Sequence, residues 1–275
     1  MLGSVSALVL FAALLHATWN ALLHGNRDRF LSITWMSLAV VPAALIAALF
    51  LPAPARAAWP YVVASGLVHI GYNASLVRAY RTGELGQAYP IARGSSPLLV
   101  ALGAAIFAHE RLTPIRILGV VLVSGGIISL TLARGRVSGA GTVAALSTGA
   151  IIAVYTVIDG AGARLSGNAA SYAAWMFVFY AGTPILFVIS RGFAALRAST
   201  RETTTSMAGG LVSIVAYGIV IWAMQFAPMG AISALRETSV LFAAFLGRIF
   251  LREKLTAARL VACLVIASGA VLLAR

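Results

Sequence analysis

Ten apolar stretches, each about as long as a lipid bilayer is thick, leave this chain few alternatives for its fold. They lie at about 3–23, 31–51, 59–80, 85–108, 114–132, 140–160, 169–190, 207–226, 229–251 and 257–274. A helix needs about 20 apolar residues to cross the hydrocarbon core, where every backbone polar group must be satisfied within the protein. Only 10% of the residues are charged, against about 25% in soluble domains. The sequence therefore predicts an all-α integral membrane protein with ten transmembrane helices.

The basic residues indicate a lipid bilayer as partner and no nucleic acid, although the net charge is +13. They stand singly between apolar stretches, which is typical of membrane topology signals. Loops after odd-numbered stretches hold thirteen Lys and Arg residues, whereas loops after even-numbered stretches, with the C-terminus, hold five. The positive-inside rule therefore places both termini outside the cytoplasm, in a multi-pass protein of the cytoplasmic (inner) membrane.

An internal repeat divides the chain into two halves of five helices. Phe107–Arg116 aligns with Phe250–Arg259 at five of ten positions, with an offset of 143 residues. The same offset aligns Arg93 with Arg236. Because five crossings is an odd number, the second copy must enter the membrane from the opposite side. The sequence thus predicts inverted repeats, an arrangement of transporters in which the substrate binds near the midplane at the repeat interface.

Several motifs carry a resemblance to a known family. They are His16-Ala-Thr-Trp-Asn20, Tyr89-Pro-Ile-Ala-Arg-Gly94, Leu235-Arg-Glu-Thr-Ser239, and the tails Glu110-Arg-Leu-Thr and Glu253-Lys-Leu-Thr. Together with the layout of two times five helices, they resemble the EamA-type transporters of the drug/metabolite transporter superfamily, with residues 1–135 and 136–275 as the two repeats. The resemblance implies a solute carrier and no particular solute. Better-studied members favour cytoplasmic termini, opposite to the charge count, so both orientations stay open.

Arg93 lies near the middle of the fourth stretch and is costly there. Even lenient insertion scales put an arginine at a helix centre at about 2.5–3.5 kcal/mol. Pro90 and Pro97 lie on the same face, and each frees the carbonyl four residues back, at Gly86 and Arg93. This pattern predicts an interrupted helix that lines a water-filled cavity. The alternative is an arginine that snorkels to the interface, over roughly 12 Å from its position about eight residues into the span.

Polar and aromatic residues on the first, third and fourth stretches fall at helical spacing and predict one shared cavity. Alternatives remain for individual residues: Trp19 as an interfacial anchor, Tyr72 as packing, and His69 as a histidine hydrogen-bonded between helices. The candidate substrate-binding residues are Arg93, Arg236, Tyr89, Trp19, Asn20, His16 and Tyr72.

Glu237 marks the main difference between the two copies, because it occupies the position of Gly94 beside Arg236. An intramembrane carboxylate either pairs with an arginine or relays protons. Glu237 and His69 are therefore the candidates for proton coupling or charge pairing, and a permanent structural lock between the arginines is the alternative for Glu237. Asp159 lies near the end of the sixth stretch, where it is expected to end that helix and not to set the pH dependence.

Other function classes find little support in the sequence. No nucleophile with a base, no histidine pair for a metal and no nucleotide-binding motif is recognisable, so no enzyme, metal or cofactor is predicted. Two arginines and one glutamate favour a secondary transporter that moves a small anionic or zwitterionic metabolite, such as an amino acid, organic acid or phosphonate, by alternating access. A multidrug or cationic exporter, a lipid flippase and a membrane enzyme are the alternatives. Small residues on the fifth and tenth stretches indicate helix packing, within the chain or in a homodimer.

Overall fold

The computed structural model describes residues 2–23, 25–26, 28–81, 85–132, 138–250 and 256–274, and the side chains of residues 74–89 are outside this description. These residues form α-helices joined by short connections and short 3₁₀ turns, with no strand among them. The α-helices are α1 (Leu2–Leu22), α2 (Arg29–Phe50), α3 (Trp59–Arg81), α4 (Leu85–Phe107), α5 (Pro114–Leu132), α6 (Gly139–Leu165), α7 (Ala169–Val178), α8 (Gly182–Arg191), α9 (Thr200–Ala223), α10 (Met229–Glu237), α11 (Ser239–Phe250) and α12 (Ala257–Leu273). The 3₁₀ turns are η1 (Arg56–Ala58), η2 (Phe179–Ala181) and η3 (Phe193–Leu196).

Seven helical segments within the described residues are long and apolar enough to cross a membrane. Two of them combine consecutive helices: Ala169–Arg191 spans α7 to α8, and Met229–Ile249 spans α10 and α11. Two shorter apolar segments are Pro114–Leu130 and Ala257–Leu273. The prediction of an all-helical, multi-pass membrane protein is confirmed, whereas the number of ten crossings stays a prediction.

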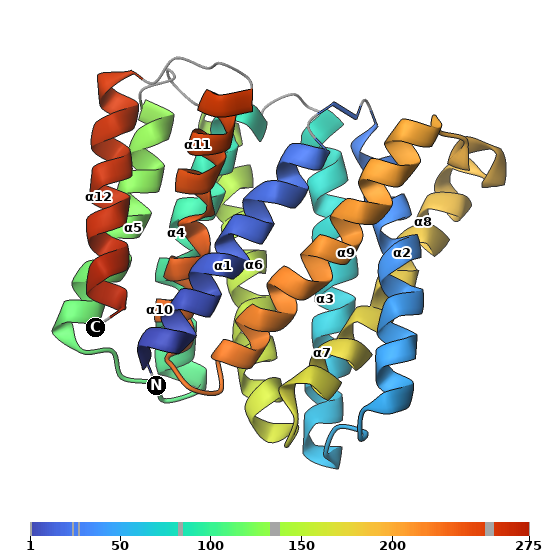
Figure 1. Cartoon of the computed structure of the whole chain (residues 1–275), viewed down its shortest axis with the longest axis horizontal. Coiled ribbons are helices and arrows are strands. Elements are labelled where there is room, and N and C mark those ends of the chain that lie inside the picture. The colour runs from blue at the N-terminus through green and yellow to red at the C-terminus, as the bar shows by residue number, and fades with distance from the viewer. Residues whose placement is uncertain are drawn as a thin grey trace.

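The helices stand side by side in one bundle, with both ends of the chain at the same end of it (Figure 1). The pair α5 and α12 forms one edge, α2 and α8 lie at the other edge, and α1, α4, α6 and α9 lie between them. A side chain on Gly119 or Gly269 would meet the other's carbonyl oxygen at 3.0 and 2.8 Å, so α5 and α12 approach closely at these two glycines. Of the small residues predicted to pack, Gly119 and Gly269 therefore pack against each other within the chain.

Two boundary predictions were wrong, for different reasons. The eighth apolar stretch begins at residue 207, but α9 begins at Thr200 because Ser199 and Glu202 form a capping box ahead of the apolar residues. Asp159 does not end its helix: α6 continues to Leu165. Polar residues that start a helix or lie inside one are invisible to a search for apolar stretches alone.

The prediction of an interrupted fourth helix was also wrong. Helix α4 runs unbroken through Pro90 and Pro97. The Arg93 carbonyl, which Pro97 cannot bond, accepts a hydrogen bond from the Ser96 hydroxyl at 3.2 Å. Breaks occur instead in the second half of the chain, at η2 between α7 and α8 and at Thr238 between α10 and α11.

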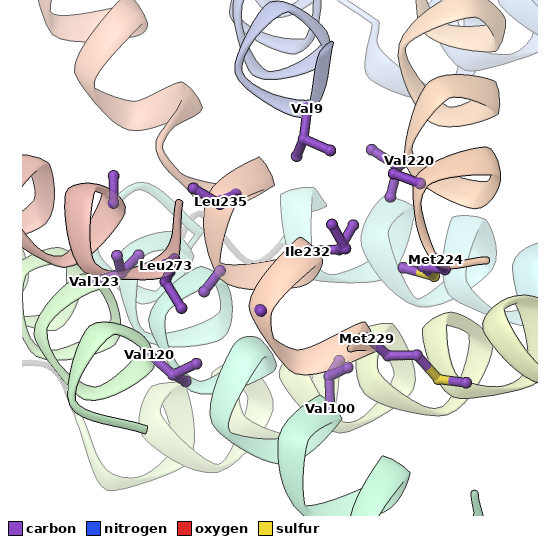
Figure 2. Packing of buried hydrophobic residues seen from close by; sticks show 14 of the residues in the cluster. Val9, Val100, Val120, Val123, Val220, Met224, Met229, Ile232, Leu235 and Leu273 are labelled. Atoms are coloured by element: carbon purple, nitrogen blue, oxygen red, sulfur yellow. The ribbon is translucent and has the colours of Figure 1, made fainter. Parts of the chain in front are cut away.

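An apolar cluster fills the half of the bundle interior towards the α10 N-terminus. Figure 2 shows Val9 from α1, Val220 from α9, and Met229 and Ile232 from α10 converging there, all of them buried. Val100 from α4 completes this part of the cluster. In lipid such a cluster stabilises mainly by close packing, because the surrounding acyl chains are as apolar as the side chains. These side chains pack the interior on that side of the bundle.

Candidate substrate cavity

One cavity of about 160 Å³ reaches the middle of the bundle. A group of the size of a water molecule needs about 10–15 Å³ of cavity volume, so the cavity has room for on the order of ten such groups. That capacity suits a small metabolite. The lining includes most of the residues selected from the sequence: His16, Trp19, Asn20, His69, Tyr72, Arg93 and Arg236. The side chain of Tyr89 lies outside the described ones.

A buried triad of charges stands where the cavity meets α10. Arg93 Nε lies 2.6 Å from Glu237 Oε2, and Arg236 Nη2 lies 3.0 Å from Glu237 Oε1. All three side chains are buried, and Glu237 is completely inaccessible. Both arginines line the cavity, while Glu237 lies behind them. The structure thus brings the symmetry-related arginines of the sequence repeat to one carboxylate.

The break between α10 and α11 is what allows Arg93 to reach across. Helix α10 ends at Glu237, and the Thr238 hydroxyl caps it by donating to the Leu235 carbonyl at 2.6 Å. A second nitrogen of Arg93, Nη2, donates to the hydroxyl of Ser239, the first residue of α11, at 3.3 Å. An arginine in the last turn of a helix also interacts favourably with the helix dipole. Arg236 has that position in α10.

His16 completes the polar contacts of Arg93. Its Nε2 lies 3.0 Å from Arg93 Nη2. A guanidinium can only donate, so this ring nitrogen accepts and the imidazole is neutral. Trp19 meets the same ring edge to face at 5.0 Å, and Asn20 donates to the His16 carbonyl at 2.8 Å. The first-helix motif therefore forms one connected wall of the cavity.

An aromatic wall faces the arginines, and sequence reasoning missed most of it. Tyr155 on α6 and Tyr217 on α9 both line the cavity. The guanidinium carbon of Arg236 lies 5.8 Å from the centre of the Tyr217 ring, within cation–π range. His69 stacks on Tyr155 at 4.1 Å. The available signal was the spacing of Tyr155 and Asp159, one helical turn apart in an apolar stretch.

Asp159 is the second buried carboxylate of the bundle. It is completely inaccessible, and its two oxygens accept hydrogen bonds from Tyr172 at 3.0 Å and Tyr217 at 2.6 Å. The principle that singled out Glu237, that an intramembrane carboxylate is functional by default, applies equally here. Proximity to glycines had hidden it, because glycine was interpreted as a helix end.

The two ends of the cavity differ in chemistry. Towards the start of α2 the lining is polar and includes Asn20, Arg29 and Asn73. Towards the start of α10 the apolar cluster of Figure 2 fills the interior. Beyond that cluster Glu110 accepts a hydrogen bond from the Met229 amide at 2.9 Å and forms an ion pair with Arg164.

Arg164 joins three segments at this end: its own helix α6, the residues after α4, and the connection between α9 and α10. Besides Glu110, which follows α4, it binds the carbonyl of Met224 at 2.8 Å after α9 and that of Ala227 at 3.2 Å before α10, from its own position near the end of α6. We call Glu110, Arg164 and the Met229 amide the clasp. It links segments of both halves of the chain at this end of the bundle.

Comparisons with known proteins agree with this architecture. Residues 139–275, the second half of the chain, match the model of the EamA-like transporter family. One solved crystal structure is similar over 98% of this chain and 97% of its own, with a TM-score of 0.77 and 24% sequence identity. That likeness shows the fold alone. Curated protein sequences give no match.

Proposed function

Because this chain belongs to the EamA-like transporter family, and is thus a membrane transporter of the drug/metabolite transporter superfamily, we propose that it carries a small anionic or zwitterionic metabolite. Amino acids, organic acids and phosphonates are the solutes of suitable size and charge. The solute binds in the central cavity, and alternating access moves it across the cytoplasmic membrane. No enzymatic step is part of this proposal.

The buried triad is the observation that carries the proposal. Two guanidinium groups and one carboxylate leave one net positive charge beside the cavity. A single charge in a poorly hydrated site strongly favours an ion of opposite sign. The planar fork of an arginine matches the edge of a carboxylate or phosphonate, and such charge-assisted bonds are about twice as strong as neutral ones.

The remaining candidate residues have supporting roles in this proposal. Trp19, Asn20, His16 and Tyr72 line the cavity and would contact the rest of the solute, together with Tyr89. A solute that carries an amine as well would draw Glu237 away from one arginine, which makes a zwitterion a suitable ligand. In the empty site Glu237 pairs charges, and proton coupling is left to His69.

Helix packing supports inverted repeats of residues 1–135 and 136–275. If the halves are equivalent, α1 corresponds to α6, α3 to α9, and α4 to α10 with α11. The contact of α4 with α6 then corresponds to that of α10 and α11 with α1, and both contacts occur. The contact of α1 with α9 likewise corresponds to that of α6 with α3, and both again occur. Two pseudo-equivalent halves around one cavity are what rocking between two open states requires.

The clasp supports alternating access from a second direction. Polar residues line one end of the cavity, and the clasp and the apolar cluster lie towards the other. Release of the solute on the side of the clasp requires Glu110 to leave Arg164 and the Met229 amide. The clasp is therefore the proposed gate on that side.

The outer surface supports a lipid partner. Large apolar side chains project from the helices, with exposed fractions of 82% at Leu49, 85% at Phe50 and 78% at Ile189. Exposed apolar surface of this extent suits acyl chains. A homodimer through α5 and α12 stays a prediction.

A thermal-shift screen of the purified protein tests the proposal. The panel contains organic acids, phosphonates, amino acids, neutral sugars and quaternary ammonium ions. Binding at a hundredfold excess over Kd stabilises by about 2.7 kcal/mol, so a true ligand raises the melting temperature clearly. We expect hits among carboxylates, phosphonates or amino acids. Hits only among neutral sugars would contradict the proposal. Hits only among quaternary ammonium ions would contradict it and favour a cation exporter.

A further inference from the structure

Two buried ionisable groups lie outside the buried triad: His69 on α3, to which proton coupling was left above, and Asp159 on α6. We propose that this pair is the proton site of the transporter, with His69 taking up the proton and Asp159 holding the opposite charge. We further propose that the proton and the anion are carried in the same direction. The second statement rests on the proposed anion site at Arg236, whereas the first does not.

Hydroxyl groups donate to both oxygens of the Asp159 carboxylate. Tyr172 and Tyr217 both donate to it, at 3.0 and 2.6 Å. Hydroxyl donors on both oxygens stabilise the charged form more than the neutral form. A buried charge still needs a cation nearby, because hydrogen bonds alone do not replace its lost hydration. The ring of His69 contacts the Tyr217 ring at 5.8 Å, the same residue whose hydroxyl binds Asp159, so His69 is the ring that supplies this cation when protonated.

The geometry of His69 leaves one nitrogen for the incoming proton. Its Nδ1 lies 3.0 Å from the Ser65 carbonyl oxygen, which can only accept, so Nδ1 carries a hydrogen. The added proton therefore binds Nε2. His69 is buried, with 4% of its surface exposed, yet it lines the cavity. A proton that enters from the cavity can reach it without crossing the apolar cluster.

The groups that face His69 set the sign of the coupling. Its direct neighbours are Ser65 on α3, Tyr155 on α6, Tyr180 in η2 and Tyr217 on α9. Tyr217 in turn contacts Asp159 on α6 and Arg236 on α10. Asp159 carries a negative charge, which favours protonation of the imidazole, and Arg236 carries a positive charge, which opposes it.

Anion binding changes that balance in one direction. A solute carboxylate on Arg236 cancels the repulsion that the imidazolium meets, so it increases the proton affinity of His69. By linkage the proton increases the affinity for the anion by the same factor. One proton and one monovalent anion move together and leave no net charge transfer. Glu237 does not serve as the proton site, because both of its oxygens already pair with arginines.

Tyr217 connects the two sites physically. Its ring lies under the Arg236 guanidinium at 5.8 Å, and its hydroxyl donates to Asp159 at 2.6 Å. A shift of Arg236 towards a bound anion thus acts on a ring whose hydroxyl holds the carboxylate. This gives the coupling a second route besides direct repulsion.

The proton site is tested first without any solute, by NMR of protein labelled at its histidines. The resonance of His69 is assigned with a His69→Gln variant, and its titration midpoint is followed. Asp159→Asn should lower the proton affinity at least tenfold. Tyr217→Phe keeps the carboxylate but removes a donor, which strengthens the carboxylate's attraction for the proton and should raise the affinity. Unchanged midpoints in both variants would overturn the assignment, and Tyr217→Phe decides alone if Asp159→Asn does not fold.

The direction of coupling is tested with acetate and methylphosphonate as probes, at constant ionic strength. When thermal shift shows that a probe binds, the His69 midpoint should rise by about one pH unit, a tenfold gain in proton affinity. A midpoint that falls or stays constant while the probe binds would overturn symport. If neither probe binds, the result counts against the anion site and therefore against symport as well. The result from the Asp159 and Tyr217 variants would still decide the proton site.

Discussion

The two arginine-bearing helices align in the predicted repeat, yet they differ in structure and in the residue that follows the arginine. Helix α4 carries two prolines and is unbroken, whereas its counterpart has no proline at this point and is divided into α10 and α11. The first copy has Gly94 after its arginine, and the second has Glu237. One copy thus supplies an intact wall, and the other supplies the counter-charge for both.

Packing explains why the carboxylate stands in the second copy. A side chain on Gly94 would begin 2.6 Å from Ile128 Cγ1 and 2.9 Å from the Ser124 carbonyl oxygen, because α4 lies tightly against α5. No glutamate fits there without separating the two helices. The broken counterpart has space for Glu237 at a helix end, from which it reaches both Arg93 and Arg236.

The largest expected effect is that of Glu237→Gln. It leaves two buried guanidinium groups without a carboxylate, and removing one partner of a buried ion pair costs about 3–5 kcal/mol. Chemical unfolding in detergent measures the loss of stability. The matched control is Glu202→Gln, which replaces an exposed capping-box residue with another good one and should change stability by less than about 0.5 kcal/mol. Equal stability of the two variants would show that the triad is not the charge balance of the bundle.

Gly94→Ala is expected to cause the next largest loss of stability. Overpacking a tight interior costs about 1–3 kcal/mol, and here the added carbon meets backbone as well as side chain. Gly125→Ala on α5 is the matched control: nothing lies within 4 Å of its added carbon, and a helical alanine there should stabilise by about 0.5–1 kcal/mol. Thermal unfolding compares them. A destabilised Gly125→Ala with a normal Gly94→Ala would reverse the packing argument.

Glu110→Gln should have a small effect on stability and a clear one on access. The ion pair with Arg164 is partly exposed, so its loss costs about 1 kcal/mol or less. The same loss favours opening of the clasped end, which a cysteine at Val9 reports by its labelling rate with a water-soluble thiol reagent, in a Cys263→Ala background. We expect faster labelling by several fold. A rate equal to that of the unmutated clasp would remove Glu110 from the gate.

The smallest changes in stability are expected from substitutions at the N-cap residues of α2 and α7. Asp28 caps α2 through the amides of Phe30 and Leu31, as Asn168 caps α7 through those of Ala170 and Ser171. Replacement of either cap by alanine should cost about 1 kcal/mol. Asp28→Asn keeps the cap and loses only the partly exposed ion pair with Arg191, so it should cost less than about 0.5 kcal/mol.

The pH dependence of the two caps should differ as well. Partial burial raises the pKa of Asp28, but the amides of Leu31 and Phe30 and the Arg191 guanidinium outweigh it, and the net pKa is lowered. A lowered pKa gives stability that is present above the ordinary value of 3.8 and is lost as the pH falls below it. Asn168 does not titrate. Acid unfolding of Asp28→Asn should thus lack a component that Asn168→Ala retains, and identical acid profiles would contradict this.

Periodicity and charge predicted the class of fold and most of the cavity lining. An arginine such as Arg93 is too costly in an apolar span unless it has a charged partner or lines a cavity. Both patterns failed where the reason is three-dimensional. That Asp159 lies inside the bundle depends on Tyr172 from α7 and Tyr217 from α9. Neither contact has a signature in the local sequence.

The most direct test of the central claim is calorimetric binding of the best anionic hit from the screen to the wild-type protein and to Arg93→Lys, with the melting temperature of both. Lysine keeps the charge beside Glu237 but loses the fork that recognises a carboxylate or phosphonate. If the arginines bind the solute, the affinity should fall at least tenfold, about 1.4 kcal/mol, and the melting temperature should stay within a few degrees. Unchanged affinity with a large loss of thermal stability would contradict the account, because it would make the triad a structural lock and not a binding site.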